Sequence, residues 1–410
     1  MAPFPLPIDS LLGHWPSYVV YIAIGFGFGY VLEIAGFGKS TKLAAQFYLK
    51  EMTVLKVMFT AIVVAAVLIF LASAMGLLDY NLVWVNPTYL WPGIVGGLVM
   101  GVGFILGGFC PGTSIVAAST LKIDGIVFLL GAFFGIFAFG ETVGLFEDFW
   151  YSSYMGRFTL QQLFNVDAGV IVLAVVLMAL AAFVFAEYSE RTFGKGLVKK
   201  APRWSLGAAG GLIVLAGVAL FIGQPTNADR QAALAIDQET ALTERSVQIH
   251  PAELLAYLNN RQIIPYVIDV RSESDFNAFH LPGAHRVPLD GILPLAQDLQ
   301  LQPRNTLFVV LSNEEAAATD AWRMLNAEGI ANVYILEGGI NKWLDTFSDE
   351  AFQAAYKVEP AGVDQLAYAL PGALGSRYDA ADPNPAAFTI EYTPKVKLSV
   401  GRGATGGGCG

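Results

Sequence analysis

The chain has 410 residues, of which 55% are hydrophobic and only 14% are charged. This composition excludes an ordinary soluble protein and indicates several membrane spans. The formal net charge of −10 lies in the second half, because residues 1–204 carry 11 basic and 11 acidic side chains whereas residues 205–410 carry 13 and 23. An acidic second half argues against nucleic-acid binding, and only two cysteines in the whole chain exclude a disulfide framework.

Six apolar stretches are long enough to cross a bilayer. They cover residues 18–35, 57–78, 93–121, 125–146, 168–186 and 205–223, and the third is interrupted at Cys110-Pro111-Gly112. We therefore expect residues 1–224 to form a polytopic α-helical membrane domain of about six spans, with one or two broken helices. Residues 1–17 carry no basic segment, so they predict an exposed lead-in and not a cleaved signal.

Basic side chains orient these spans. Lysines follow the first span, and a cluster of Lys and Arg follows the fifth, so the positive-inside rule places both loops in the cytoplasm. The aromatic loops 79–92 and 147–167 and everything after residue 223 then lie outside. We expect a multi-pass protein of the bacterial inner (cytoplasmic) membrane with an extracytoplasmic C-terminal part.

The second half changes pattern after a polar, helical linker at residues 225–245. In residues 246–348, strands at 266–270, 307–311 and 333–336 alternate with helical stretches at 251–260 and 316–328, which is typical of a parallel α/β domain. Residues 349–410 form an extension. It is expected to contain a strand pair at 388–392 and 395–400, followed by a flexible Gly-rich tail that ends in Cys409-Gly410.

Two membrane segments resemble each other, each with a Gly-Phe break followed by Ser/Thr and a new helix. They contain Gly36-Phe37-Gly38-Lys39-Ser40-Thr41 and Gly108-Phe109-Cys110-Pro111-Gly112-Thr113-Ser114. Pro-Gly after Cys110 cannot continue a regular helix, and broken backbone at membrane depth is tolerated only inside protein or beside a water-filled cavity. The new helix starts attract anions, as they do in the discontinuous helices of transporters.

These breaks predict a path for a small anion. A thiol beside two anion-attracting helix ends suits an ion with a soft sulfur end, such as thiosulfate, and Lys39 adds a positive charge at the cytoplasmic mouth. The alternative is that Cys110 is merely a small buried apolar residue. The candidate path residues are Cys110, Gly108, Pro111, Gly112, Thr113, Ser114, Gly38, Lys39, Ser40 and Thr41. No cofactor and no metal site are expected.

Residues 18–223 resemble the YeeE/YedE sulfur-transport family. The resemblance rests on Ala35-Gly36-Phe37-Gly38 with Lys42-Leu43-Ala44, and on Gly108-Phe109-Cys110-Pro111-Gly112. It implies inward transport of thiosulfate or a related sulfur compound, with membrane cysteines that hand the ion along by thiol contacts. Gly38 stands where many relatives have cysteine, so Cys110 alone remains in the membrane. A homodimer and a path with a single thiol are both left open.

Residues 246–347 resemble a rhodanese domain. The matching segments are Asp269-Val270-Arg271-Ser272-Glu273-Ser274-Asp275-Phe276, His280-Leu281-Pro282-Gly283-Ala284-His285 and Leu336-Glu337-Gly338-Gly339-Ile340-Asn341-Lys342-Trp343. Active rhodaneses place a nucleophilic cysteine after the strand at 307–311, and here that position is Ser312, followed by Asn313, Glu314 and Glu315. Because serine cannot form a persulfide and two glutamates repel thiosulfate, the resemblance implies an inactive domain. Asp269, Arg271 and His280 are then expected to be structural.

The leading hypothesis is a transporter, not an enzyme, that carries thiosulfate or a similar sulfur anion across the lipid bilayer. Its rhodanese-like domain would dock a periplasmic sulfur-carrying or redox protein. One alternative is a membrane-anchored docking subunit of a periplasmic sulfur-oxidising or electron-transfer complex. The other is a sulfurtransferase in which Cys409 is the sulfur carrier.

Overall fold

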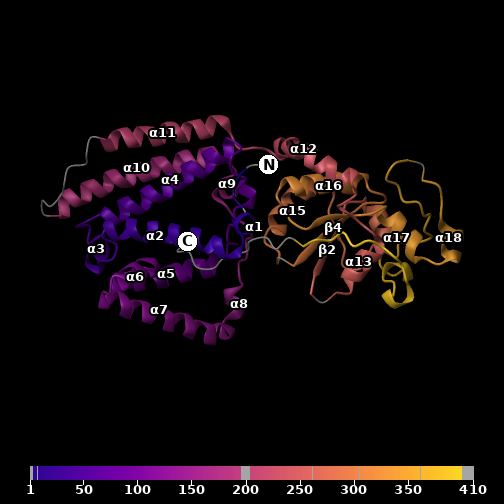
Figure 1. Ribbon diagram of the computed structural model, residues 1–410, viewed down its shortest axis with the longest axis horizontal. Helices are drawn as coiled ribbons and strands as arrows, with labels where there is room; N and C mark the ends of the chain where they lie inside the picture. The colour runs from indigo at the N-terminus through magenta and orange to yellow at the C-terminus, as the bar shows by residue number, and fades with distance from the viewer. Residues whose placement is uncertain are drawn as a thin grey trace. The chain divides into compact units, whose positions relative to one another are not determined.

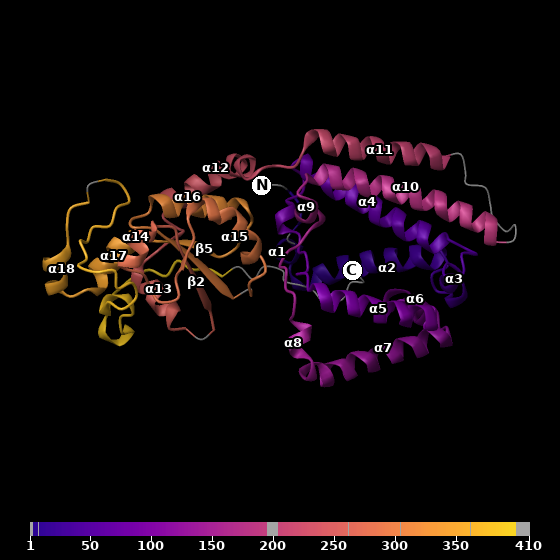
Figure 2. The same ribbon diagram turned by 180° about the vertical axis from the view of Figure 1, so that it is seen from behind.

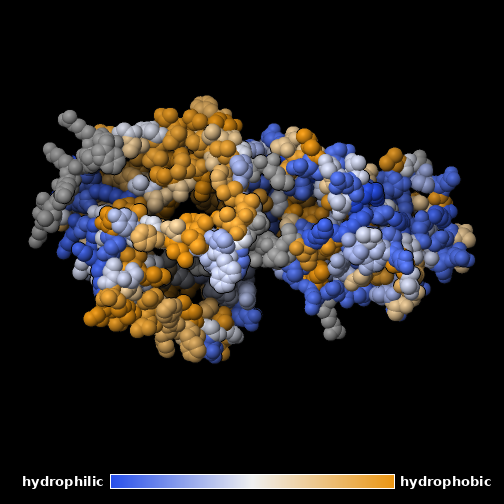
Figure 3. Space-filling model, viewed as in Figure 1, coloured by the Kyte–Doolittle hydropathy of each residue, from blue (hydrophilic) through white to orange (hydrophobic). Residues whose placement is uncertain are grey.

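The computed structural model describes residues 3–6, 8–194, 204–260, 262–303, 305–360 and 362–398 (Figure 1). It contains a helical unit that ends at Gln224 and an α/β unit that begins at Pro225. In Figure 3, hydrophobic residues cover most of the visible face of the helical unit. Hydrophilic residues cover most of the visible face of the α/β unit. The two surfaces fit a membrane domain and a water-exposed domain.

The helical unit consists of long apolar helices joined by short ones. Its elements are α1 (Ile8–Leu12), α2 (His14–Ile34), α3 (Ser40–Ala45), α4 (Thr53–Ala74), η1 (Tyr80–Leu82), α5 (Leu90–Gly107), α6 (Pro111–Ser119), α7 (Ile123–Thr142), η2 (Val143–Leu145), α8 (Glu147–Trp150), α9 (Leu160–Phe164), α10 (Ala168–Phe193) and α11 (Trp204–Ile222).

Among the described residues, five segments are long and apolar enough to cross a membrane, namely α2, α4, α5 with α6, α7 with η2, and α10. A sixth passes only when α11 is joined to the following helix α12 (Asn227–Thr243), across a bend of 72°. Because α12 is polar, we count α11 alone as the sixth span. The structure thus agrees with the expected polytopic domain of about six spans.

The internal repeat takes the form of two hairpins. In each, a long helix breaks, a short helix follows, and a second long helix returns: α2–α3–α4 and α5–α6–α7. The short helices α3 and α6 lie at the same end of the helical unit in both views (Figure 1, Figure 2). Helices α4, α10 and α11 pack around a separate buried cluster that includes Val67, Val176 and Ala216.

The α/β unit has a five-stranded, all-parallel sheet of order β1-β5-β4-β2-β3. Its strands are β1 (Gln248–Ile249), β2 (Ile264–Asp269), β3 (His285–Arg286), β4 (Thr306–Leu311) and β5 (Val333–Leu336). Its helices are α12 (Asn227–Thr243), α13 (Pro251–Leu258), α14 (Glu273–Ala278), η3 (Leu289–Gly291), α15 (Ile292–Leu299), α16 (Ala316–Ala327), α17 (Gly339–Phe347), α18 (Glu350–Tyr356), η4 (Asp379–Ala381) and η5 (Pro385–Ala387).

The central strand β4 shows why this sheet is covered on both faces. Successive side chains of a strand point to opposite faces. Leu307 and Val309 accordingly lie in one buried cluster, with residues of α13 and α17, and Phe308 and Val310 lie in the other, with residues of α15 and α16. An apolar run of this kind is typical of a parallel strand buried on both sides.

Residues 225–243 belong structurally to the α/β unit, because α12 packs against α16. Arg230 forms an ion pair with Glu328, and Gln238 donates to the Asn326 side chain over 2.9 Å. Arg230 Nε also donates to the Ala327 carbonyl over 3.0 Å. The predicted helix is therefore present as a docked element of the domain.

The predicted strand pair at 388–392 and 395–400 is wrong for the described residues 388–398, which form no strand. Their N–H groups bond to side chains instead of a neighbouring strand. Lys395 N and Val396 N both donate to Glu253 Oε1 over 2.9 Å, and Lys397 N donates to the Tyr334 hydroxyl over 2.8 Å. Pro394 lacks an N–H group, which also weakens a ladder at this point.

Candidate functional site

The two Gly-Phe breaks of the helical unit meet each other. A Cβ placed on Gly108 would come within 3.1 Å of the Ser40 Cβ, so the second break lies directly against the start of α3. Phe37 and Phe109, the aromatic residues of the two breaks, are each 1% exposed and share one buried cluster with Leu43. The repeat therefore builds one site from both hairpins.

Cys110 is the N-cap residue of α6. Thr113 N donates to Cys110 Sγ over 3.4 Å, and Cys110 N donates to Thr113 Oγ1 over 2.9 Å, which together form a capping box. The thiol also lies 3.2 Å from Thr113 Oγ1. Pro111 follows as the first helical residue, where its missing N–H group costs nothing. Cys110 is half-buried, so its thiol is held in place without being sealed off.

Charged side chains surround the first break. Lys122 Nζ lies 3.2 Å from Glu33 Oε1, and a Cβ on Gly38 would come within 2.6 Å of the same Nζ. Ser40 Oγ donates to Asp124 Oδ2 over 2.9 Å. The two acids and the lysine come from the end of α2 and from the turn that opens α7. They place the breaks at a polar end of the helical unit, where hydrophilic side chains gather around α3 in Figure 3.

The other predicted path residues divide into two groups. Thr113 and Ser114 are buried, and Ser114 Oγ donates to the Pro111 carbonyl over 2.7 Å. Lys39 and Thr41 are exposed. Cys110, Thr113, Ser40, Gly38 and Gly108 thus gather at the breaks. The predicted sulfur carrier Cys409 lies outside the described residues.

A third charged contact fixes the loop between α3 and α4. Glu190, on α10, is 7% exposed and accepts from Met52 N over 2.7 Å and from Lys56 Nζ over 2.5 Å. Neither Glu190 nor the pair Lys122 and Asp124 is among the site residues predicted from the sequence. The signal available for Lys122 and Asp124 was a charged Lys-x-Asp segment at the start of an apolar helix.

The α/β unit holds the second candidate site, the loop that follows β4. Ser312 is 1% exposed, and its hydroxyl has no hydrogen-bond partner in the part of the chain that the structure describes. Its carbonyl accepts from Ile340 N over 2.9 Å. A Cβ on Gly339, whose φ is +57°, would come within 2.6 Å of the Asn313 carbonyl oxygen. Only glycine fits so close to this loop.

A buried ion pair supports the same loop. Arg271 donates to both carboxylate oxygens of Asp269, through Nε over 2.9 Å and through Nη2 over 2.7 Å, and both side chains are essentially unexposed. Arg271 also donates to the Asn313 side chain over 3.3 Å and to the Phe279 carbonyl over 2.6 Å. The N–H groups of its guanidinium are therefore already hydrogen-bonded to Asp269, Asn313 and Phe279.

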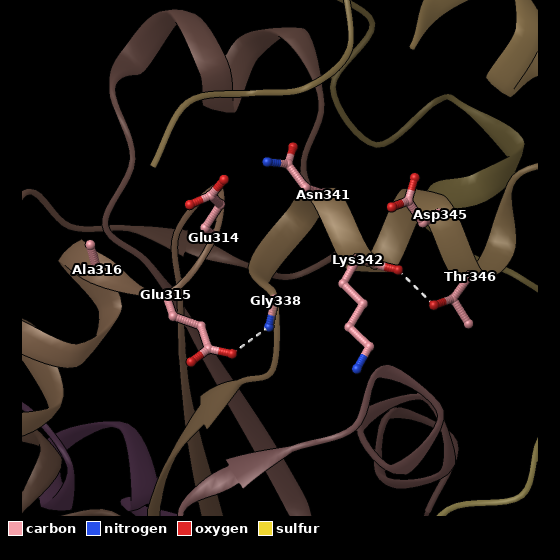
Figure 4. A pocket seen from close by; sticks show the side chains of 8 residues that line it. All are labelled: Glu314, Glu315, Ala316, Gly338, Asn341, Lys342, Asp345 and Thr346. Carbon is pink, nitrogen blue, oxygen red and sulfur yellow. Dashed lines mark hydrogen bonds between the residues drawn. The ribbon is translucent and has the colours of Figure 1, made fainter. Parts of the chain in front are cut away.

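The open pocket beside this loop is acidic (Figure 4). Its lining residues are Glu314, Glu315, Ala316, Gly338, Asn341, Lys342, Asp345 and Thr346. The single ammonium, that of Lys342, is paired with Glu337 over 2.5 Å. Within the described ranges, no three His, Cys, Asp or Glu side chains gather in a way that could hold a metal ion.

Comparisons with known proteins identify both units. A family model described as Sulphur transport matches residues 35–261, which is more than half of the chain. A second model, described as Rhodanese-like domain, matches residues 250–346. A search of curated proteins gives no match. The chain is thus a multi-pass membrane protein that belongs to the sulphur transport family and carries a rhodanese-like domain after its membrane helices.

Proposed function

We propose that this protein carries thiosulfate or a related small sulfur anion through the site where its two helix breaks meet. The observation that carries the proposal is the contact of Gly108 with Ser40, which joins the first break to the one that holds Cys110. Membership of the sulphur transport family supports the class of cargo. Thiosulfate is the specific candidate because it offers a sulfur end to a thiol and oxygen atoms to hydrogen-bond donors.

The capping box gives Cys110 a defined role. Its thiol stands at the positive end of the α6 dipole, which favours an anion. A thiol is a weak donor, so the contact with the cargo is soft and reversible. Glu33 forms an ion pair with Lys122, and Asp124 accepts a hydrogen bond from Ser40. The negative charges of these two acids limit how tightly an anion is held. Weak binding is what conduction through a site requires.

The loop charges favour one orientation. The basic side chains at the end that holds α3 and α6 favour a cytoplasmic position for that end. The chain crosses the membrane an odd number of times between the loop that holds α3 and Pro225. With that loop in the cytoplasm, the α/β unit is therefore extracytoplasmic. A C-terminal reporter fusion that is active only in the cytoplasm would overturn this orientation.

We further propose that the rhodanese-like domain is not catalytic. Ser312 lacks the thiol that a persulfide requires, and Arg271 is bound to Asp269 and Asn313 and so is not free to hold an anion. The acidic pocket repels small anions and suits a basic surface of a partner protein. A sulfur-carrying or redox protein of the periplasm is the proposed partner.

The test is uptake of labelled sulfur from thiosulfate in cells that lack other routes. Cys110→Ser keeps an N-cap oxygen but removes the thiol, and Cys110→Ala removes both. If the thiol contacts the cargo, both variants lose uptake at wild-type expression levels. If uptake survives in Cys110→Ser but fails in Cys110→Ala, Cys110 acts only as a helix cap and its thiol does not contact the cargo. Cys409→Ala, in the same assay, decides whether the tail takes part.

Well-expressed wild type without any uptake would refute the thiosulfate proposal. The docking-subunit alternative then gains support if a periplasmic protein co-purifies with the chain in stoichiometric amount. Thiosulfate-dependent sulfur transfer by the purified protein that depends on Cys409 would favour the sulfurtransferase alternative.

A further inference from the structure

We propose that the chain fills the loop after β4 with a carboxylate of its own, that of Asp364, and so closes the rhodanese-like site from within. Asp364 lies in the C-terminal extension, far from the loop in sequence. We call residues 362–368 the strap. This inference concerns the α/β unit, and it stands whether or not the helical unit carries thiosulfate.

The carboxylate of Asp364 bonds to backbone donors of the loop. Glu314 N donates to Asp364 Oδ1 over 2.6 Å, and Ala317 N donates to Asp364 Oδ2 over 2.7 Å. These N–H groups lie at the start of α16, a helix of 12 residues whose first turn carries the positive end of its dipole. The carboxylate therefore sits where a negative group is best stabilised in this loop.

The backbone of Asp364 is bound as well. Asn313 Nδ2 donates to the Asp364 carbonyl over 3.0 Å, and Asp364 N donates to Glu314 Oε2 over 3.4 Å. The φ of Asp364 is +57°, a conformation that aspartate adopts more readily than most residues. Glycine would adopt it more easily still, but it could not supply the carboxylate.

The remainder of the strap is tied to α17. Asn341 Nδ2 donates to the Gln365 carbonyl over 2.8 Å, and Ala367 N donates back to Asn341 Oδ1 over 2.8 Å. Tyr368 is 3% exposed, and its hydroxyl donates to Asp345 Oδ1 over 2.6 Å. Figure 4 shows Asn341 on α17 next to Glu314, and Asp345 further along the same helix. The strap thus crosses from the loop to the helix that flanks it.

Two independent changes therefore separate this domain from a sulfur-transferring one. Ser312 removes the nucleophile, and Asp364 takes the N–H groups that an oxyanion would need. The hydroxyl of Ser312 lies at the head of this loop, where it is buried and has no partner among the described residues. A thiol restored at position 312 alone would remain shielded.

Hydrogen–deuterium exchange of the full chain in detergent tests the strap. Asp364→Gly removes the carboxylate without backbone strain, and Asp364→Asn keeps the side-chain shape without the charge. The amides of Glu314 and Ala317 should exchange at least about tenfold faster in Asp364→Gly, with an intermediate effect in Asp364→Asn. Asp349→Gly is the matched control, because Asp349 caps α18 in the same extension by accepting from Phe352 N. Unchanged exchange at Glu314 and Ala317 in both Asp364 variants would overturn the proposal.

A thiol probe gives a second readout. The reporter substitution Ser312→Cys is made in a background that carries Cys110→Ala and Cys409→Ala. Alkylation by iodoacetamide should be slow when Asp364 is present and at least about tenfold faster when Asp364→Gly is added. Equal alkylation rates with and without Asp364 would show that the strap does not close the loop.

Discussion

Gly108 and Ser40 lie in contact, with the Ser40 carbonyl oxygen 3.2 Å from the position that a Gly108 Cβ would occupy. Gly108 also has a φ of +69°, in the left-handed region. Two requirements therefore act on one residue, since the turn that ends α5 needs this backbone conformation and the neighbouring helix start leaves no room for a side chain. The joint between the two hairpins depends on this glycine.

Gly108→Ala should separate the breaks and abolish sulfur uptake. The left-handed backbone alone costs alanine about 1–2 kcal/mol, and the contact with Ser40 adds to that cost. The matched control is Gly103→Ala on α5, because a Cβ there meets no described atom within 4 Å. It should leave uptake unchanged. Equal uptake by the two variants would show that the contact between the hairpins does not depend on Gly108.

Glu190→Ala should destabilise the helical unit by about 2–4 kcal/mol, because it leaves Met52 N and Lys56 without their buried acceptor. Glu187→Ala on the same helix is the control. Glu187 pairs with the exposed Arg191, and such pairs contribute about 0–0.5 kcal/mol. The two variants should differ clearly in thermal unfolding in detergent, and identical midpoints would count against a structural role for Glu190.

Thr113→Val should weaken the start of α6 by about 1 kcal/mol, since it removes the hydroxyl that accepts from Cys110 N. The freed thiol should also react faster with alkylating reagents, because it loses its 3.2 Å contact with the Thr113 oxygen. Thr113→Ser keeps the hydroxyl and serves as the control. The measurement is the alkylation rate of Cys110 in a Cys409→Ala background. A rate that does not differ between the two variants argues against the capping box.

The pKa of His250 is lowered, chiefly by burial and also by the charge of Lys342. Its Nδ1 accepts from Ala252 N at the start of α13, so the neutral ring is the form that caps the helix. Because the unfolded chain binds the proton more readily, this stabilisation is present above about pH 6.5. It is lost as the pH falls through the lower pKa of the folded state.

His250→Asn keeps a capping acceptor that does not titrate in this range. Between pH 7.5 and pH 5.5, the opening free energy of the α13 amides should fall more in wild type than in His250→Asn. Hydrogen exchange of the full chain, corrected for intrinsic rates, measures it. If the opening free energy falls equally with pH in the two proteins, protonation of His250 is not what destabilises α13.

The fold was largely predictable where a periodic apolar pattern decides the structure. The apolar run at residues 307–311 predicts a strand of a parallel α/β domain, and six apolar stretches predict the membrane helices. Strands β1 and β3 contain two residues each, too few to show any period. Residues 388–398 have strand-like composition, but the side chains of Glu253 and Tyr334 take up their N–H groups.

The site was predictable only in part. The Gly-Phe-Cys-Pro-Gly sequence locates the break and the helix start at Pro111, because proline and glycine act on the local backbone. The sequence does not show that Ser40 meets Gly108, or that Asp364 reaches Glu314, because these contacts join distant segments. Asp364 lies in an irregular stretch without any periodic signal, so nothing local marks it.

The length of α5 has a consequence for the proposed path of the anion. Its 18 residues rise about 27 Å, close to the ~30 Å thickness of the hydrocarbon layer, and Cys110 comes only after its last turn. In the proposed orientation, an ion that enters from outside passes the whole of α5 before it meets sulfur. On the proposed path, the cysteine would act on departure into the cytoplasm, and selection at entry would fall to residues at the extracytoplasmic end of α5.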